Sequence, residues 1–220
     1  LVMNHTSDQH PWFQEARDPA SAQRDWYVWQ DEAPSDPEYW HQDDNGSYYY
    51  GYFWSGMPDL NYRNAEVTAV MQEIIRYWLE DMGADGYRLD AIKHLIEDGA
   101  MIENTPATHT WLQNEFYPFV KDVDPEALTV GEIWSTPDDI VPYIGDEVDI
   151  AFEFSLADAI LESAVSGRKV NVERAQQTVA ETYPPGQFAT FLANHDQNRT
   201  RSRLLNDEQA KVAATLQLTL

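Results

Sequence analysis

The sequence predicts an α/β protein built on a parallel sheet, either a doubly wound open sheet or part of a (β/α)8 barrel. From residue 64 onward, short apolar runs alternate with longer segments of helical periodicity, which is typical of βαβ units. No Gly-x-Gly-x-x-Gly motif follows any of the short runs, and this weakens the case for a dinucleotide-binding open sheet. Acidic residues end or follow three of the runs. In a barrel, such residues meet at one mouth.

The expected elements follow one another in a regular order. Residues 64–83 have the clearest helical pattern, with Asn64 as N-cap and Gly83 at the C-terminal end. The predicted strands are residues 1–3, 86–90, 128–132, 150–154 and 188–194, and the later predicted helices are residues 109–121, 137–144, 155–166, 172–181 and 206–220. Five strands are about three fewer than a closed barrel needs, so we expect these residues to be part of a longer chain.

Residues 6–56 differ in character from the rest of the chain. They are polar, rich in turn-forming residues and dense in Trp and Tyr. This composition predicts a small subdomain without regular structure, in which most of the aromatic side chains form a core.

Composition narrows the classes of function. Asp and Glu number 38 against 14 Lys and Arg, a formal charge of −24, so nucleic acid is not expected as a partner. The sequence contains no run of about 18 apolar residues, so a membrane span is not expected. The absence of cysteine excludes disulfides, thiol catalysis and thiolate zinc sites. The chain opens on a strand-like run without an initiator methionine, so we expect the natural start to lie upstream, and the compartment is left open.

Three carboxylates stand at the ends of predicted strands, namely Asp90, Glu132 and Asp196. Hydrolysis of a glycosidic bond uses a nucleophile and a protonated acid, and a third carboxylate would stabilise oxocarbenium-like charge. Taken singly, each residue would more often be a helix cap or a solvated loop residue. Arg88 shares a strand face with Asp90 and would keep it ionised, and Trp134 would shield Glu132 from water.

Five segments, in this order, resemble the signature motifs of the α-amylase family, glycoside hydrolase family 13. They are residues 1–5 (Leu-Val-Met-Asn-His), 57–61 (Met-Pro-Asp-Leu-Asn), 86–94 (Gly-Tyr-Arg-Leu-Asp-Ala-Ile-Lys-His), 130–133 (Val-Gly-Glu-Ile) and 191–196 (Phe-Leu-Ala-Asn-His-Asp). The resemblance covers essentially the whole chain. It implies a partial (β/α)8 TIM barrel, about strands 3 to 7, with residues 1–5 as strand 3, residues 6–60 as an inserted subdomain B and residues 61–220 as βα units 4 to 7.

The resemblance also implies roles for individual residues. Asp90 would be the nucleophile, Glu132 the general acid/base and Asp196 the residue that stabilises the transition state. The substrate would be an α-glucan or malto-oligosaccharide, and the residues expected to contact it are His5, Arg88, Lys93, His94 and His195.

A calcium site is implied in the same way. Its ligands would be the Asn4 side chain, the Asp59 carboxylate and the His94 main-chain carbonyl, and oxygen ligands of this kind suit a hard cation. Some relatives lack the ion, in which case Asp59 would only cap the following turn.

The subfamily is less well defined. Ala91 favours cleavage of α-1,4 bonds, because relatives selective for α-1,6 bonds tend to carry valine there, and the pair Lys93 and His94 favours endo-hydrolysis of starch. Residues 57–61 fit an enzyme of short maltodextrins equally well. The alternatives are an α-glucosidase or a transglycosylase, such as a trehalose synthase or glucanotransferase, and more remotely a non-catalytic sugar-binding relative. A calcium-dependent structural module would leave Glu132 and Asp196 without a role.

Overall fold

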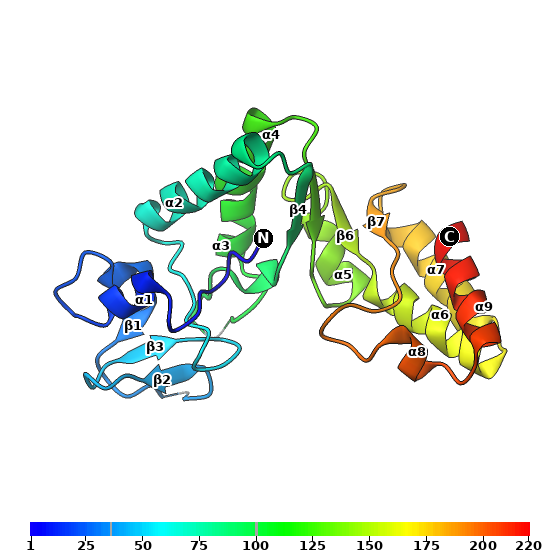
Figure 1. Cartoon of the computed structure of the whole chain (residues 1–220), viewed down its shortest axis with the longest axis horizontal. Helices are drawn as coiled ribbons and strands as arrows, with labels where there is room; N and C mark the ends of the chain where they lie inside the picture. Colours follow the sequence, from blue (N-terminus) through cyan, green and yellow to red (C-terminus); the bar gives the residue numbers. More distant parts are fainter. Residues whose placement is uncertain (36, 100) are drawn as a thin grey trace. The chain divides into compact units, whose positions relative to one another are not determined.

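The computed structural model describes residues 1–35, 37–99 and 101–220, which divide into two compact units, Leu1–Thr129 and Val130–Leu220. Figure 1 gives the order of the helices and strands along the chain. The assignment of residues 1–5, 6–60 and 61–220 to a barrel strand, an inserted subdomain and later barrel units stays a prediction.

The first part of unit 1 contains a small antiparallel sheet. Helix α1 (Pro11–Ala16) and a 3-10 turn (Arg24–Trp26) precede three strands, which pair in the order β1-β3-β2 (Figure 1). The strands are β1 (Trp29–Gln30), β2 (Trp40–Gln42) and β3 (Tyr48–Tyr50). The prediction that this region lacks regular structure is therefore wrong. Tyrosine suits a pleated, half-buried surface, and β3 is three consecutive tyrosines paired on both edges.

Aromatic packing holds this region together, as the sequence predicts. The ring of Phe13 stacks on Trp29 with the centroids 5.6 Å apart and meets the edges of Tyr27 and Tyr49 at 5.0 and 4.9 Å. Tyr27 is 1% exposed and Phe13 is 3% exposed. Such aromatic pairs contribute beyond the area that they bury.

The rest of unit 1 is helical around two strands. Its elements are α2 (Ala65–Arg76) with a π-helical turn (Tyr77–Asp81), β4 (Gly86–Leu89), a 3-10 turn (Ile92–His94), α3 (Pro106–Trp111) with a π-helical turn (Leu112–Phe116), α4 (Tyr117–Val123) and the start of β5 (Leu128–Gly131). The Asn64 side chain accepts a hydrogen bond from the Glu66 backbone N–H, which confirms the predicted N-cap. The predicted helix 109–121 is interrupted where Pro118, which has no N–H to donate, forces the widened turn before α4.

Parallel pairing aligns the strands of unit 1. The N-terminal residues lie beside β4, with a parallel bridge between Val2 and Asp90 and a bond of 3.0 Å from the Asp90 N–H to the Leu1 carbonyl. On the other side of β4, the Leu128 N–H donates to the Asp85 carbonyl at 3.0 Å. This approach depends on Gly86, since a Cβ at that position would lie 2.0 Å from the Leu128 carbonyl oxygen.

Unit 2 contains the end of β5 and strands β6 and β7 of the parallel sheet, whose strand order is β4-β5-β6-β7. Its elements are the end of β5, α5 (Pro137–Ile140) with a 3-10 turn (Val141–Tyr143), β6 (Ile150–Phe152), α6 (Phe154–Ser166), α7 (Val170–Thr182), β7 (Phe188–Ala189), α8 (Thr200–Arg203) and α9 (Asp207–Thr219). Val130 pairs with Ile150 and Ala151 with Phe188, both in parallel register. Helix α6 is the most buried helix, because both α7 and α9 pack on it.

Strand β7 is much shorter than the predicted strand 188–194. It ends at Ala189, whose carbonyl accepts the Glu153 N–H at 3.2 Å. Glu153 is also the N-cap of α6, so β6 turns into a helix at that point. Residues after Ala189 therefore have no further β6 backbone to pair with, although their sequence is suitable for a strand.

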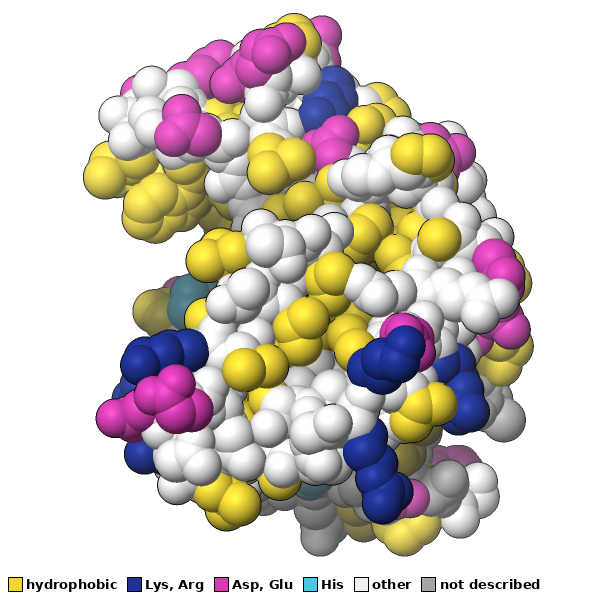
Figure 2. Space-filling model, turned by 90° about the vertical axis from the view of Figure 1, so that its right-hand side faces the viewer, with side chains coloured by type: hydrophobic (Ala, Val, Ile, Leu, Met, Phe, Trp, Pro, Cys, Tyr) yellow, Lys and Arg dark blue, Asp and Glu magenta, His cyan; other side chains and the backbone are white. Residues whose placement is uncertain are grey.

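The surface of the described residues carries both charged and apolar groups. Figure 2 shows hydrophobic side chains interspersed with acidic and basic ones. In unit 2 the exposed apolar side chains include Val170, Leu205, Val212 and Leu218. Within residues 1–35, 37–99 and 101–220, no helix combines the length and apolar character needed to cross a membrane.

The close approach at Gly86 generates a stability prediction. Its φ is +148°, and Gly86→Ala would also push a Cβ into the Leu128 backbone, so we expect a loss of at least about 3 kcal/mol in the free energy of unfolding. The matched control is Gly83→Ala, because Gly83 also has positive φ, +68°, but no atom lies within 4 Å of the added Cβ. That control should lose only about 1–2 kcal/mol. Denaturant unfolding of both variants measures the difference, and equal losses would contradict the role assigned to the strand contact.

Candidate active site

Asp90 directly follows β4 in unit 1, and its carboxylate is held by an arginine on the same strand face. The Arg88 Nη1 donates a charge-assisted hydrogen bond to Asp90 Oδ1, as the alternation of side chains along the strand predicts. The Asp90 side chain is 18% exposed. One carboxylate oxygen is therefore oriented by the protein while the group stays accessible.

His5 lies in the same neighbourhood as Asp90. Burial lowers the pKa of the His5 imidazole, and the Asp90 carboxylate opposes that effect. The ring meets the edge of Phe53 with centroids 5.3 Å apart. His5, Arg88 and Asp90 are thus brought together in unit 1, and at neutral pH the imidazole is uncharged and able both to donate and to accept a hydrogen bond.

The backbone turns sharply after Asp90. Ala91 has a φ of 51°, in the left-handed region that a residue with a Cβ rarely adopts, and it caps the following 3-10 turn. The turn carries Lys93, whose Nζ lies 2.7 Å from the Glu103 carboxylate. Lys93 is accordingly ion-paired in unit 1, and its predicted contact with substrate stays a prediction.

His94 is a buried residue with a neutral side chain. Its ring stacks on Tyr52 with the centroids 3.8 Å apart, and its side chain is 5% exposed. Burial lowers the pKa of His94 to about 4, against the opposing hydrogen bond to the Ile102 carbonyl. A direct contact between this imidazole and a sugar stays a prediction.

Asn4 and Asp59 form a buried polar cluster close to these residues. Their exposed fractions are 0% and 3%, and neither Asn4 Oδ1 nor Asp59 Oδ2 has a hydrogen-bond partner among the described residues. The Leu60 N–H donates to the Asn4 carbonyl at 2.9 Å, which brings the two residues together. The Tyr52 N–H donates to Asp59 Oδ1 at 3.4 Å, and because Tyr52 also stacks on His94, all three predicted metal ligands share one neighbourhood.

The electrostatics of this cluster are unusual for a carboxylate. Burial raises the pKa of Asp59 well above its usual value, and the Asn4 amide opposes this only in part. No group of three or more His, Cys, Asp or Glu side chains suited to a metal occurs within residues 1–35, 37–99 and 101–220. A cation here would therefore depend on amide and main-chain oxygens as well as on Asp59, and the two unpartnered oxygens fit a hard ion.

Glu132 and the end of the segment 191–196 come together in unit 2. Glu132 directly follows β5, and its Oε1 accepts a hydrogen bond of 3.0 Å from Asn194 Nδ2. The Asp196 backbone N–H donates to Asn194 Oδ1 at 3.1 Å. His195 Nε2 lies 3.3 Å from Asp196 Oδ2, and both side chains are exposed. Glu132 is thus linked through one asparagine to the loop that carries Asp196 and His195.

Trp134, two residues after Glu132, belongs to an aromatic pair. The indole of Trp134 stacks on Phe154 with centroids 4.9 Å apart and an interplanar angle of 10°, and Phe154 meets the edge of Phe191. Trp134 is 50% exposed, so it shields the site less completely than the sequence suggests. Asn194 is not among the site residues predicted from the sequence, although it stands inside the motif that contains His195 and Asp196.

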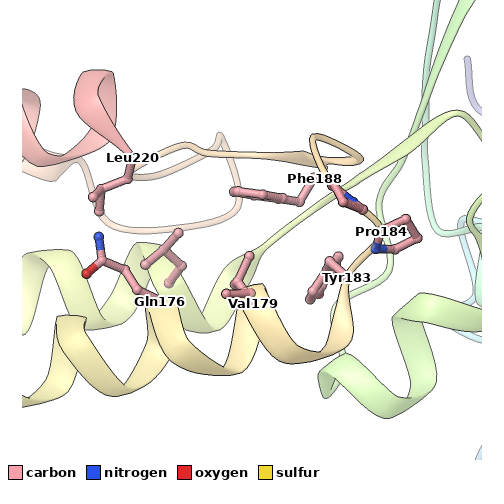
Figure 3. A pocket seen from close by; sticks show the side chains of 9 residues that line it. Gln176, Val179, Tyr183, Pro184, Phe188 and Leu220 are labelled. Carbon is pink, nitrogen blue, oxygen red and sulfur yellow. The ribbon is translucent and has the colours of Figure 1, made fainter.

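A further cavity in unit 2 contains none of these residues. It measures about 380 Å³ and is lined by α7, the segment that follows it and Leu220 just after α9. In Figure 3, Val179, Tyr183, Phe188 and Leu220 border it. No acidic or basic side chain lines the cavity, so it is not a candidate for acid/base chemistry.

Comparison with known proteins identifies the family. The model of the α-amylase catalytic domain matches residues 1–220. The chain belongs to the α-amylase family. An α-amylase family member of Dictyoglomus thermophilum, alpha-amylase 3, is 35% identical over 100% of this chain and 44% of its own length. The trehalose synthase/amylase TreS of Mycobacterium tuberculosis is 36% identical over 90% of this chain and 36% of its own length.

Solved structures of the α-amylase family agree with the fold. The crystal structure of an alpha-amylase from H. orenii superposes with a TM-score of 0.83 at 38% identity, covering 99% of this chain and 46% of that one. The four parallel strands are therefore part of a (β/α)8 barrel, and the barrel is confirmed over the doubly wound sheet. The chain spans less than half the length of each of these relatives.

Proposed function

We propose that this chain carries the catalytic carboxylates of a retaining glycosidase that cleaves α-1,4-glucosidic bonds in maltodextrins or starch. The observation that supports the proposal most strongly is the end-to-end match to the α-amylase catalytic domain, with an acidic residue retained at each of three signature positions, Asp90, Glu132 and Asp196. A sugar-binding relative without catalysis would have no use for all three.

In the proposed mechanism, Asp90 attacks the anomeric carbon while Glu132 protonates the departing glycosidic oxygen. Glu132 then takes a proton from water, which hydrolyses the covalent glycosyl-enzyme. Arg88 keeps Asp90 oriented for the attack. Asp196 stabilises positive charge that develops on the sugar ring, and His5 and His195 hold its hydroxyl groups. A retaining pair requires the two reacting carboxyl groups to be about 5–5.5 Å apart.

A second candidate function is transglycosylation or exo-cleavage on the same residues. The relative named trehalose synthase/amylase is as similar to this chain as the relative named alpha-amylase 3, at 36% and 35% identity. Both functions use the same glycosyl-enzyme, and they differ in whether water or a sugar hydroxyl takes the glycosyl group. Incubation of the complete protein with maltose separates them, because a synthase yields trehalose without releasing an equivalent amount of glucose.

The catalytic assignment generates the first functional prediction. In the complete protein, Glu132→Gln and Asp90→Asn should each lower turnover of maltoheptaose by about 10²–10⁴-fold or more while leaving the melting temperature nearly unchanged, because each removes a chemical step. The first product of the unaltered enzyme should be the α-anomer by NMR. Initial release of the β-anomer, or near-normal activity of either variant, would rule out the assignment.

Bond specificity is a separate prediction. Ala91 favours α-1,4 over α-1,6 cleavage, so we expect higher kcat/KM for maltose or maltotriose than for isomaltose. Competition between maltotriose and isomaltose at equal concentration, followed by chromatography, measures the ratio. Preferential consumption of isomaltose would contradict the interpretation of Ala91.

A bound calcium ion is part of the proposal. The ligands would be Asn4 Oδ1, Asp59 and the His94 carbonyl, and a cation there would compensate the buried Asp59 carboxylate, whose Oδ2 has no hydrogen-bond partner among the described residues. Its role would be structural: it would connect the N-terminal segment to the turn that follows Asp90. The support for this ion is the pair of unpartnered, buried oxygens.

The calcium proposal predicts a chelator effect on stability. Excess chelator should lower the melting temperature of the complete protein by about 5–10 °C, since a ligand that binds only the folded state stabilises it by mass action. Asp59→Asn should abolish the response, and Asp81→Asn, at an exposed position in the same unit, should retain it. Identical melting curves with and without chelator would argue against a resident ion.

A further inference from the structure

The Asn194 side chain uses both ends of its carboxamide at once. Its Nδ2 donates to Glu132 Oε1 at 3.0 Å, and its Oδ1 accepts the Asp196 backbone N–H at 3.1 Å. One uncharged side chain therefore contacts the proposed acid/base directly and shapes the turn that carries the proposed transition-state stabiliser. The family motif supplies a role for Glu132, His195 and Asp196 but not for this residue.

The orientation of the carboxamide is fixed by its two partners. A backbone N–H can only donate, so the atom facing Asp196 must be the oxygen. The NH2 group is then left to face Glu132. The main chain of Asn194 is held as well, because its N–H donates to Gln197 Oε1 at 3.2 Å and its carbonyl accepts the Gln197 N–H at 3.4 Å.

This contact distinguishes the two oxygens of Glu132. With an N–H donor directed at Oε1, a proton on that oxygen would face another hydrogen. The proton of the neutral acid is therefore favoured on Oε2. General acid catalysis needs the proton on the oxygen that faces the leaving group, and a small misplacement of such a group costs a large factor in rate.

We propose that Asn194 is the positioning residue for the acid/base, holding Glu132 Oε1 so that Oε2 delivers the proton. The inference rests on the proposed glycosidase function. In the first step the proton passes from Oε2 to the glycosidic oxygen as the bond to the anomeric carbon breaks and the bond to Asp90 forms. In the second step a water proton returns to Oε2 as the water oxygen displaces Asp90.

Two substitutions distinguish the contact of Asn194 Nδ2 with Glu132 from the contact of Asn194 Oδ1 that shapes the Asp196 turn. Asn194→Ser keeps a short side-chain oxygen that accepts the Asp196 N–H but cannot reach Glu132, because Ser forms the same kind of turn. Asn194→Ala removes both contacts. The matched control is Asn171→Ala, since Asn171 Nδ2 also donates to a glutamate, the exposed Glu162, at 2.9 Å, away from the site.

The readout is leaving-group dependence in the complete protein. Cleavage of maltotriose needs protonation of the departing sugar oxygen, whereas α-maltosyl fluoride releases fluoride and needs little protonation, and kcat/KM reports the steps through first bond cleavage for both. We expect Asn194→Ser and Asn194→Ala to lower kcat/KM for maltotriose by about 10- to 100-fold and for the fluoride by less than about threefold. Asn171→Ala should change neither value.

Each other outcome overturns the inference. Wild-type behaviour of Asn194→Ser beside an impaired Asn194→Ala would show that only the turn matters, and equal losses on both substrates would indicate a general structural defect. The serine variant retains the turn, so it keeps the test decisive if the alanine variant does not fold. Glu132→Gln is run in parallel: if it lacks leaving-group dependence, the proposed role of Glu132 fails, and if only the Asn194 variants lack it, the positioning role fails.

Discussion

Parallel strand pairing is the constraint on which the rest of this structure depends. Because parallel strands all end at the same edge of a sheet, the residues that follow each strand lie at that edge. In unit 1 the pairing of the N-terminal residues with β4 brings His5 towards Asp90. In unit 2 the pairing of β5, β6 and β7 leaves Glu132 and residues 190–196 at corresponding strand ends.

Several polar groups of unit 1 are buried near the predicted metal ligands. His94 is neutral, and His5 Nδ1, Tyr50 Oη and Asp59 Oδ2 lack partners among the described residues. Buried atoms of this kind cost free energy unless they are compensated. In unit 2, His195 and Asp196 are exposed, and Asn194 links their loop to Glu132 by hydrogen bonds of 3.0 and 3.1 Å.

The sequence predicts features that depend on neighbouring residues better than features that depend on residues far apart in the chain. Periodicity and capping are local, so the helix begun by Asn64 and the strand before Asp90 are predicted correctly. The length of β7 depends on where β6 ends, and the widened turn before α4 depends on Pro118 in a helix that otherwise continues. The contact between Asn194 and Glu132 joins residues 62 positions apart, which no spacing rule reveals. The sheet of residues 29–50 depends on the pairing of strands, which aromatic composition alone does not reveal.

The left-handed backbone at Ala91 has a consequence for how bond specificity would change in this scaffold. A β-branched residue is strongly disfavoured at a φ of 51°. Exchange of the methyl group for an isopropyl group would therefore add more than bulk beside the nucleophile, because it would also press the whole turn towards another conformation. Lys93 and His94 lie on that turn, so their positions would shift with it. A substitution that changes bond selectivity at this position would therefore also change the main-chain conformation. A new bond preference would require compensating substitutions along the turn.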